Sequence, residues 1–260
     1  MIFLTLESYA ICGLGSVREE NQDNLYVDGT IRKPAESTDT FHHSAVSEER
    51  GLYAVADGMG GGAHGGLASF LIVQEMIEKE YYFFESYNGT ERFLLHANEI
   101  ICDLMKKNKG NYIGSTFAGL CIDKGIAVVS NIGDSRIYLL REGNFVQLSL
   151  DHTAVHRMVK MGVISEEVAR THPDRNKLTQ HLGVFPSEMI IEPHCEHMNI
   201  NKDDIFLLCS DGLTDMVNDK EIQNILMSED SLEQKANILF TESLNNGGRD
   251  NISILLVSVS

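Results

Sequence analysis

The chain has 260 residues, 43% of them apolar, and its 38 acidic and 21 basic side chains give a formal net charge of −17. This length suits one sizeable core, so we expect a single domain over residues 1–260, and the negative charge argues against a nucleic-acid partner. No apolar run approaches the ~18 residues of a membrane span, so we expect no membrane partner.

Hydrophobic periodicity divides the first half of the chain into strands and helices. The N-terminal segment has no basic stretch and carries Glu7, so we expect a first strand rather than a signal peptide. In chain order we expect strands over Thr5–Gly13 and Gly51–Ala56, helices over Gly66–Glu80 and Thr90–Lys109, and strands over Ser115–Ile122, Gly125–Ile132, Ser135–Leu140 and Asn144–Leu148.

The second half of the chain alternates in the same way. Very short turns join the strands between residues 115 and 148, so we expect a meander of antiparallel strands there. Strands in runs with helices in pairs indicate an α+β layered architecture. The remaining elements are helices over Thr153–Met161 and Ser165–Thr171, strands over Ile190–Ile200 and Ile205–Ser210, helices over Asp219–Met227 and Ser231–Asn245, and a strand over Asn251–Val259.

Aspartates recur where apolar strands begin or end. Asp57–Gly58, Asp134–Ser135 and Asp211–Gly212 each follow an apolar run, and Asp250–Asn251 precedes one. Strand ends meet at the rim of a sheet, so these carboxylates can converge, and a divalent cation would neutralise their repulsion. Such hard oxygen ligands favour Mg²⁺ or Mn²⁺ over zinc. A single Asp-Gly is more often a plain turn, as we expect for Asp28–Gly29.

Cysteines and histidines indicate no zinc site. The histidine pairs His152 with His156 and His194 with His197 lack further ligand spacing, so we expect surface or loop histidines. The cysteines form no CxxC pair, so we expect reduced, buried thiols and a cytoplasmic protein. They are Cys12, Cys102, Cys121, Cys195 and Cys209.

Six sequence blocks occur in a fixed order. They are Gly15-Ser-Val-Arg-Glu-Glu-Asn-Gln-Asp23, Asp57-Gly-Met-Gly-Gly61, Gly114-Ser-Thr116, Asn131-Ile-Gly-Asp-Ser-Arg136, Ser210-Asp-Gly-Leu-Thr-Asp215 and Gly248-Arg-Asp-Asn-Ile-Ser253. Together they resemble the metal-dependent protein phosphatase (PPM, type 2C) family, especially its compact bacterial members. Asp151-His-Thr153 and Thr171–Thr179 resemble that family's flap, at about residues 151–179.

The resemblance implies a four-layer αββα sandwich, with two antiparallel sheets flanked by helix pairs and metals in a cleft at one end. Two Mn²⁺ or Mg²⁺ ions are implied, with Asp57 bridging both and the Gly58 carbonyl binding the first. Asp211 and Asp250 complete the ligands of the second ion. Asp134 with Asp211 resembles the pair that holds a weaker third ion.

The resemblance also implies the reaction, in which metal-activated water hydrolyses phosphoserine or phosphothreonine without a covalent intermediate. Arg18 matches the arginine that grips the substrate phosphate, and Asp23 matches the acid that supports metal-bound water. The implied partners are phosphorylated proteins and a cognate serine/threonine kinase, and we expect a monomer.

Three departures from the family pattern lie near these residues. Gln22 stands where many members carry Glu, and Met59 stands where animal members have a histidine thought to protonate the leaving group. Bacterial relatives share this Met, and the general acid is left unassigned. Gly62 and His64 rearrange the usual glycine-histidine stretch.

Two other functions were weighed. Gly58–Ala63 matches a dinucleotide-binding G-x-G-x-x-A after a strand and before a helix, but Asp57 would repel a pyrophosphate and antiparallel hairpins follow. A pseudo-phosphatase would use the same fold as a binding module. Its signature would be the loss of Asp57, Asp211 or Asp250, and all of these are present.

Overall fold

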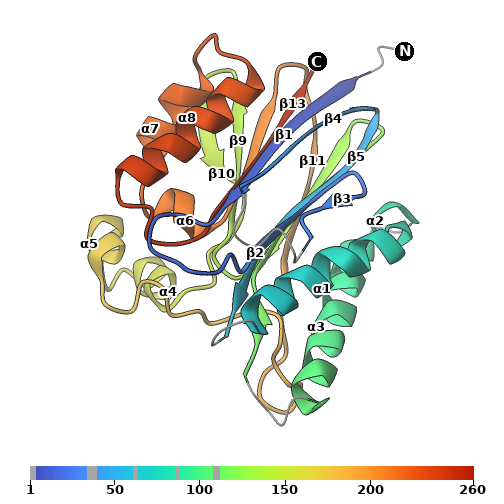
Figure 1. Ribbon diagram of the computed structural model, residues 1–260, viewed down its shortest axis with the longest axis vertical. Coiled ribbons are helices and arrows are strands. Elements are labelled where there is room, and N and C mark those ends of the chain that lie inside the picture. The colour runs from blue at the N-terminus through green and yellow to red at the C-terminus, as the bar shows by residue number, and fades with distance from the viewer. Residues whose placement is uncertain (1–3, 34–39, 61–63, 86–87, 108–111) are drawn as a thin grey trace.

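Two antiparallel β-sheets lie face to face at the centre of the structure, and helices cover the outer face of each sheet (Figure 1). The structure is a computed structural model that describes residues 4–33, 40–60, 64–85, 88–107 and 112–260. This arrangement confirms the α+β, four-layer αββα sandwich expected from the sequence.

The first sheet is centred on β13, which lies between β1 and β12. Its Ile252–Val259 run is buried except at one position because both faces of the strand are covered. From edge to edge the order is β10 (Asn144–Gln147), β9 (Arg136–Arg141), β12 (Ile205–Cys209), β13 (Ile252–Val259), β1 (Thr5–Gly13) and β4 (Phe41–Glu48).

The second sheet is centred on β5 and β7, whose small and β-branched side chains are buried. Asp28 and Gly29, at φ +43° and +87°, form a turn, as expected, and this turn joins β2 to β3. The order is β11 (His194–Asn199), β8 (Ile126–Ile132), β7 (Phe117–Asp123), β5 (Arg50–Met59), β2 (Asp23–Val27) and β3 (Thr30–Ile31), with β6 (Gly114–Ser115) paired to the end of β5.

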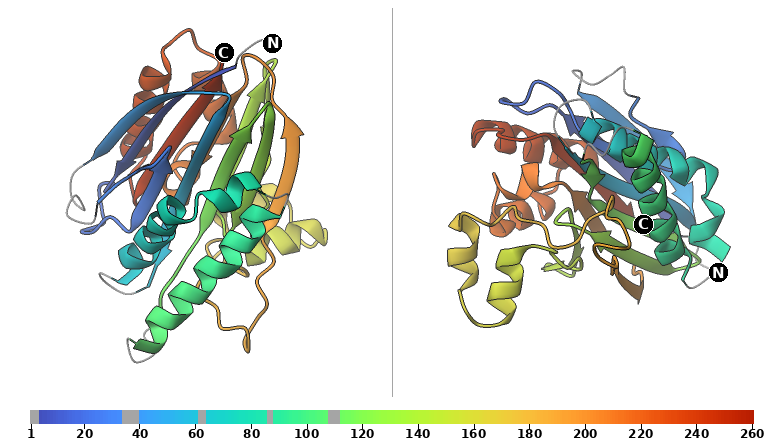
Figure 2. Two further views of the ribbon diagram at one scale, coloured as in Figure 1. Left: turned by 90° about the vertical axis from the view of Figure 1, so that its right-hand side faces the viewer. Right: turned by 90° about the horizontal axis from the view of Figure 1, so that it is seen from below.

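Helices α1, α2 and α3 pack on the second sheet, and α7 and α8 pack on the first (Figures 1 and 2). Among the described helices, none is both long and apolar enough to cross a membrane. The helices are α1 (His64–Glu78), α2 (Tyr81–Glu85), α3 (Gly89–Lys107), α4 (Ala154–Lys160), α5 (Glu166–Thr171), α6 (Asp211–Thr214), α7 (Asp219–Leu226) and α8 (Leu232–Asn245).

Apolar side chains of the described residues fill each space between neighbouring layers. Their burial supplies the main stabilisation of the sandwich and fixes the two sheets against each other. Representative residues are Ile72 and Phe93 outside the second sheet, Val55 and Val257 between the sheets, and Ile222 and Leu239 outside the first sheet.

The meander expected between residues 115 and 148 is wrong as a single sheet. β7 with β8 and β9 with β10 form antiparallel hairpins, as expected, but the hairpins belong to different sheets. The chain crosses between the sheets at Gly133, whose φ is +103°. A Cβ at that position would lie 2.6 Å from Thr116 Cγ2, so this crossing requires glycine.

Other expectations need smaller corrections. The strand expected over Ile190–Ile200 is shorter, and β2, β3, β4, α2 and α6 were not expected. The cysteines are free thiols and most are buried, but Cys195 is exposed. The predicted helix end at Lys109 lies outside the described residues, as do residues 61–63.

Candidate metal centre

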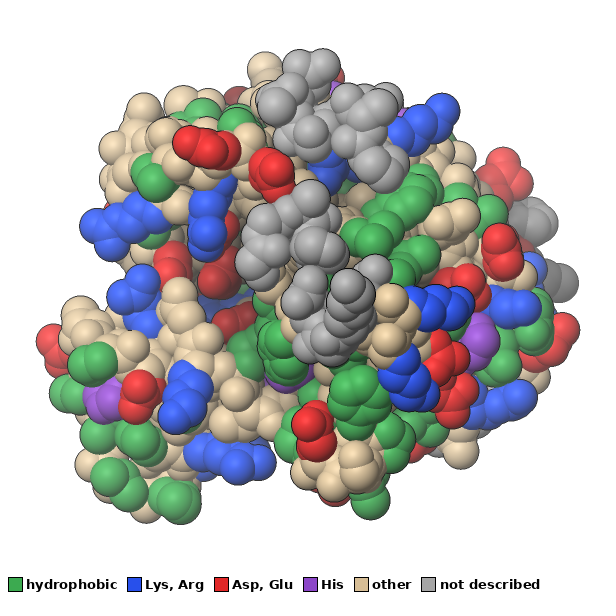
Figure 3. Space-filling view, turned by 60° about the horizontal axis from the view of Figure 1, so that its bottom comes forward, with side chains coloured by type: hydrophobic (Ala, Val, Ile, Leu, Met, Phe, Trp, Pro, Cys, Tyr) green, Lys and Arg blue, Asp and Glu red, His purple; other side chains and the backbone are tan. Residues whose placement is uncertain are grey.

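Acidic side chains from both sheets gather at one end of the sandwich. Asp57 on β5 is in register with Asp23 on β2, so the second sheet brings two carboxylates to the same level. In the first sheet β12 ends beside the start of β13, which brings Asp211, the first residue of α6, near Asp250. Asp134 lies where the chain crosses between the sheets. Viewed toward this end, acidic and basic side chains meet in a hollow (Figure 3).

Burial first, and mutual repulsion second, govern the electrostatics of this acidic group. Burial raises the pKa of Asp57 well above its usual range, and the charges of Asp23, Asp211, Asp134 and Asp250 raise it further. The pKa of Asp211 is also raised well above its usual range, by burial first and then by Asp134 and Asp250. Buried acids in such a group cannot all ionise cheaply unless positive charge is supplied.

The donor chemistry of this group fits a divalent cation. Asp211 Oδ1 is buried and has no hydrogen-bond partner among the described residues, so a hard oxygen ligand is left unused. Carboxylate oxygens are the ligands that Mg²⁺ and Mn²⁺ prefer. In this conformation, no three His, Cys, Asp or Glu side chains of the described residues form a complete metal-binding group. The fit therefore rests on the carboxylate chemistry and on the unsatisfied Asp211 oxygen.

Glycines allow the loops that carry the acids to approach one another closely. A Cβ on Gly58 would lie 2.1 Å from the Gly65 carbonyl oxygen, at the start of α1. A Cβ on Gly212 would lie 1.9 Å from the Asn251 carbonyl oxygen, which precedes β13. Any larger residue at either position would push apart segments that carry site residues.

Arg18 and Asn251 connect the loop before β2 to the segment before β13. Arg18 donates from Nη2 to Asp250 Oδ2 over 2.5 Å, and its side chain is 52% exposed. Asn251 accepts from the Gln22 amide (2.8 Å) and donates to the Leu14 carbonyl (2.9 Å). The resemblance implies that Arg18 grips the substrate phosphate, and in this conformation it also pairs with Asp250, one of the expected metal ligands. Its exposed half leaves the guanidinium accessible to a phosphate.

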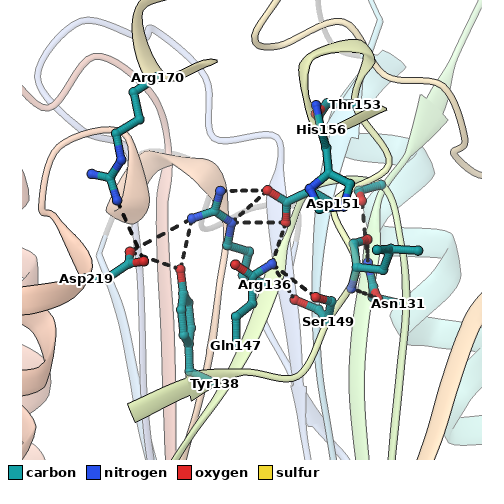
Figure 4. Close-up of polar contacts among 12 residues, drawn as sticks. Asn131, Arg136, Tyr138, Gln147, Ser149, Asp151, Thr153, His156, Arg170 and Asp219 are labelled. Atoms are coloured by element: carbon teal, nitrogen blue, oxygen red, sulfur yellow. Dashed lines mark hydrogen bonds and ion pairs between the residues drawn. The ribbon is translucent and has the colours of Figure 1, made fainter. Parts of the chain in front are cut away.

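Arg136 lies at the centre of a polar network (Figure 4), and its charge acts on the Asp134 carboxyl. Burial and then the charge of Asp151 raise the pKa of Asp134 to about 7, although Arg136 opposes them. Arg136 donates to Asp151 from Nε (3.0 Å) and Nη2 (2.6 Å), and from Nη1 to the Tyr138 hydroxyl (2.9 Å). This bidentate pair fixes the first residue of the flap region against β9.

Thr116 and Ser135 contact both acid-bearing segments, although sequence reasoning did not single them out. Thr116 Oγ1 accepts from the Asp57 amide over 3.1 Å and bonds Ser135 Oγ over 2.7 Å. The backbones at Asp57 and Asp134 are thereby held together across the cleft. The only sequence signal for these hydroxyls was their place inside two of the six blocks.

The flap region, about residues 151–179, contains α4 and α5, which project from the sandwich (Figure 2, right). An isolated bridge between Thr153 and Leu178 closes its base. Arg175 Nη2 pairs with Asp215 Oδ2 over 3.0 Å, which joins the flap to the end of α6. The flap is therefore attached next to the acidic group.

Two hypotheses from the sequence about this end can be compared with the structure. His152 lies in a loop, as expected, but it is buried and its Nδ1 accepts from the Gly133 amide over 3.1 Å. Dinucleotide binding at Gly58–Ala63 is wrong, because β5 pairs antiparallel with both β2 and β7 and the fingerprint requires parallel strands. Residues 61–63 of that motif, Gly62 among them, lie outside the described part of the chain.

Comparison with known proteins agrees with this geometry. The "Serine/threonine phosphatase stp" of Listeria welshimeri is 36% identical over 258 residues, covering 94% of this chain and 92% of the relative. The "Protein phosphatase PhpP" of Streptococcus pneumoniae is 32% identical over 237 residues, covering 88% and 94%.

Solved structures share the whole fold. The serine/threonine phosphatase PstP/Ppp of Mycobacterium tuberculosis superposes with a TM-score of 0.80 at 27% identity, over 98% of both chains. A PstP catalytic domain in complex with two manganese ions superposes with a TM-score of 0.79 at 27% identity, over 98% of this chain and 99% of that one. The family model described as Protein phosphatase 2C matches residues 28–250. The chain therefore belongs to the protein phosphatase 2C family, as the six sequence blocks indicated.

Proposed function

We propose that this chain is a metal-dependent protein-serine/threonine phosphatase whose metal centre is the acidic group at the end of the sandwich. Its family and its relatives support phosphatase activity, and the solved PstP catalytic domain holds two manganese ions. The observation that carries the proposal is the convergence of Asp57, Asp211 and Asp250, with Asp211 Oδ1 left unsatisfied.

The proposed ligands come from both sheets. Asp57 and the Gly58 carbonyl would hold the first Mn²⁺ or Mg²⁺ ion, and Asp57, Asp211 and Asp250 would hold the second. Bound divalent cations supply activation of water and neutralise charge on the transferring phosphoryl group. The chain itself holds the two acidic segments at a fixed separation. Gly58 and Gly212 allow this close approach, because a side chain at either position would clash with neighbouring backbone.

Arg18 and Asp23 have proposed roles that need no metal contact. The exposed half of Arg18 binds phosphate oxygens of the substrate, for which its planar fork is suited. Asp23 is buried opposite Asp57, and its proposed role is to orient water at the metal centre. The side chain that protonates the leaving group is not assigned.

Asp134 is proposed as the ligand, with Asp211, of a weaker third cation. Its support is electrostatic, since the charge of Asp134 is the largest of the neighbouring charges acting on the Asp211 carboxyl. We further propose that the chain acts as a single monomeric domain in the cytoplasm, with a flap at about residues 151–179. A serine/threonine kinase acting on the same phosphoproteins is its proposed counterpart.

The decisive test is turnover of phosphoserine and phosphothreonine peptides by chelator-stripped protein, before and after addition of Mn²⁺ or Mg²⁺. We expect no turnover without metal, recovery with either ion, and much slower turnover of a phosphotyrosine peptide. Full activity in metal-free protein would exclude the metal-dependent reaction. Tight phosphopeptide binding without turnover, in metal-loaded protein, would support the pseudo-phosphatase alternative.

A further inference from the structure

Asp23 is connected to the opposite sheet through a single carboxylate oxygen. Its Oδ2 accepts from Ser210 Oγ over 2.7 Å and from Ser253 Oγ over 2.8 Å. Asp23 is 1% exposed and both serines are fully buried. Asp23 begins β2 of the second sheet, whereas Ser210 directly follows β12 and Ser253 lies in β13 of the first sheet. A buried polar bridge therefore joins the sheets at their acidic end.

Counting protons shows that both hydroxyls are committed to Asp23. A serine hydroxyl has one proton to donate. Ser210 Oγ also accepts from the Ser253 amide over 3.0 Å, which uses a lone pair and leaves its one proton free to donate. The Asp23 carboxylate at 2.7 Å is a nearer and stronger acceptor for that proton than the Asn251 carbonyl at 3.4 Å. Ser253 Oγ lies 3.3 Å from Cys12 Sγ, a weak acceptor compared with the carboxylate. Asp23 Oδ2 thus receives two short hydrogen bonds.

The bridge joins the two halves of the proposed metal centre. Ser210 directly precedes Asp211, and Ser253 follows Asp250 by three positions in the same segment. On the other sheet, Asp23 is the register partner of Asp57. A shift of either serine relative to Asp23 would therefore change the separation between ligands on opposite sheets.

The backbone of Asp23 is held as well, from the second sheet. Arg32 is 2% exposed and donates from Nη2 to the Asp23 carbonyl over 2.6 Å and to the Asn21 carbonyl over 3.0 Å. With its backbone fixed in this way, the Asp23 carboxylate is a rigid point to which the first sheet can be positioned.

We propose that Ser210 and Ser253 are positioning residues, which set the separation between the two sheet-borne halves of the metal centre by binding Asp23 Oδ2. They touch neither substrate nor proposed metal and act through Asp23. The inference rests on the proposed two-cation function and adds to it the inter-sheet contact on which ligand geometry depends.

The test compares Ser210→Ala, Ser253→Ala and the double variant with wild type. Calorimetric titration of chelator-stripped protein with Mn²⁺ should show affinity about tenfold weaker in each single variant, the scale of one lost charge-assisted hydrogen bond. The Mn²⁺ affinity of the double variant should fall by less than the product of the two single-variant fold-changes, because both bonds end on one oxygen. At saturating Mn²⁺, kcat should fall while KM for a phosphoserine peptide stays unchanged.

Ser8→Ala is the matched control. Ser8 is a buried serine of β1 in the same sheet, but its Oγ donates to the Ala45 carbonyl over 3.3 Å, away from the acidic group. We expect it to change the urea midpoint of the metal-free protein without changing Mn²⁺ affinity. Ser253→Thr and Ser210→Thr, which retain the hydroxyl, should recover Mn²⁺ binding more than the alanine variants.

The outcomes separate this inference from the proposed function. If wild type binds Mn²⁺ and turns over phosphopeptide but the alanine variants bind Mn²⁺ as Ser8→Ala does, the serines have no positioning role. If wild type neither binds Mn²⁺ nor shows metal-dependent turnover, the proposed function itself fails. Should an alanine variant not fold, the corresponding threonine and cysteine variants decide the point, since cysteine keeps the volume but donates weakly. Equal Mn²⁺ affinity in the threonine variant and the cysteine variant at the same position would overturn the inference.

Discussion

Asp57 is buried among the other acids of the site, and burial first, then the charges of Asp23, Asp211, Asp134 and Asp250, raise its pKa. Asn in its place removes the proposed bridging ligand, so we expect Asp57→Asn to lower kcat by about three orders of magnitude or more. Phosphopeptide turnover at saturating Mn²⁺ measures this. A variant with wild-type kcat would show that Asp57 is not a ligand.

Arg18 allows substrate binding to be separated from metal binding. Removing one charge-assisted phosphate contact should raise KM for a phosphopeptide about ten- to a hundredfold in Arg18→Ala. Mn²⁺ affinity should be retained or increased, because Asp250 loses its ion-pair partner. Steady-state kinetics and calorimetry measure the two effects. Arg50→Ala, whose ion pair with Asp123 lies at the end of β7 away from Thr116, is the control. An unchanged KM would place Arg18 outside the phosphate site.

Asp134, unlike the other proposed ligands, lies in the crossover between the two sheets. We expect Asp134→Ala to fold, to keep two tightly bound ions and to lose most of its phosphatase activity, since only a weaker third ion is removed. Metal titration and turnover on the same preparation test this. If both match wild type, Asp134 only stabilises its turn and the third site does not exist.

The acids of the site were predictable because each ends or precedes an apolar strand and lies in a recognisable block. Thr116, Ser135 and Asn251 were not singled out, although they hold the acid-bearing segments together. Hydroxyl and amide side chains have no comparable local pattern, since their role depends on partners distant in sequence, from 19 residues between Thr116 and Ser135 to 229 between Gln22 and Asn251. Such contacts are visible only in the folded chain.

At the scale of elements, sequence predicted the strands and helices that bury continuous apolar faces. β1 was predicted over its full Thr5–Gly13 span. The helix predicted over Ser231–Asn245 begins one residue later, at Leu232, because Ser231 caps it in a capping box with Gln234. β4 was missed because it is an edge strand whose side chains are half-buried on one face and exposed on the other, including Val46. Helix α6 was missed because four residues are too few for a helical period.

The junction between α6 and β13 should respond sharply to added volume. A Cβ on Gly212 would lie 1.9 Å from the Asn251 carbonyl oxygen, so Gly212→Ala must push α6 away from the segment that carries Asp250. We expect a lower unfolding temperature, and weaker Mn²⁺ binding because Asp211 moves with α6. Gly66→Ala in α1 is the control, since its nearest neighbours would be at an ordinary 3.5 Å. Equal Mn²⁺ affinity in both variants would show that the junction tolerates the shift.

For the whole molecule, the acidic end lowers the stability of the metal-free fold as pH rises. Asp23 and Asp134 have pKa values raised to about 6 and about 7, chiefly by burial, against about 3.9 for an unfolded aspartate. Between about pH 3.9 and about pH 7 these aspartates bind more protons in the folded chain than in the unfolded chain, so the free energy of unfolding falls as pH rises. His152 acts in the opposite direction, because burial lowers its pKa to about 4 and its contribution increases as pH rises toward about 6.5.

Comparing variants isolates the aspartate contribution from that of His152. Without metal, Asp134→Asn should match wild type in unfolding temperature near pH 4 and exceed it by several degrees near pH 7, since the buried charge is gone. Saturating Mn²⁺ should stabilise wild type more at pH 7 than at pH 5, because proton release no longer opposes ion binding. Thermal unfolding followed by circular dichroism across this pH range measures both effects. An Asp134→Asn variant that is less stable than wild type throughout would show that this carboxylate stabilises the metal-free fold instead of straining it.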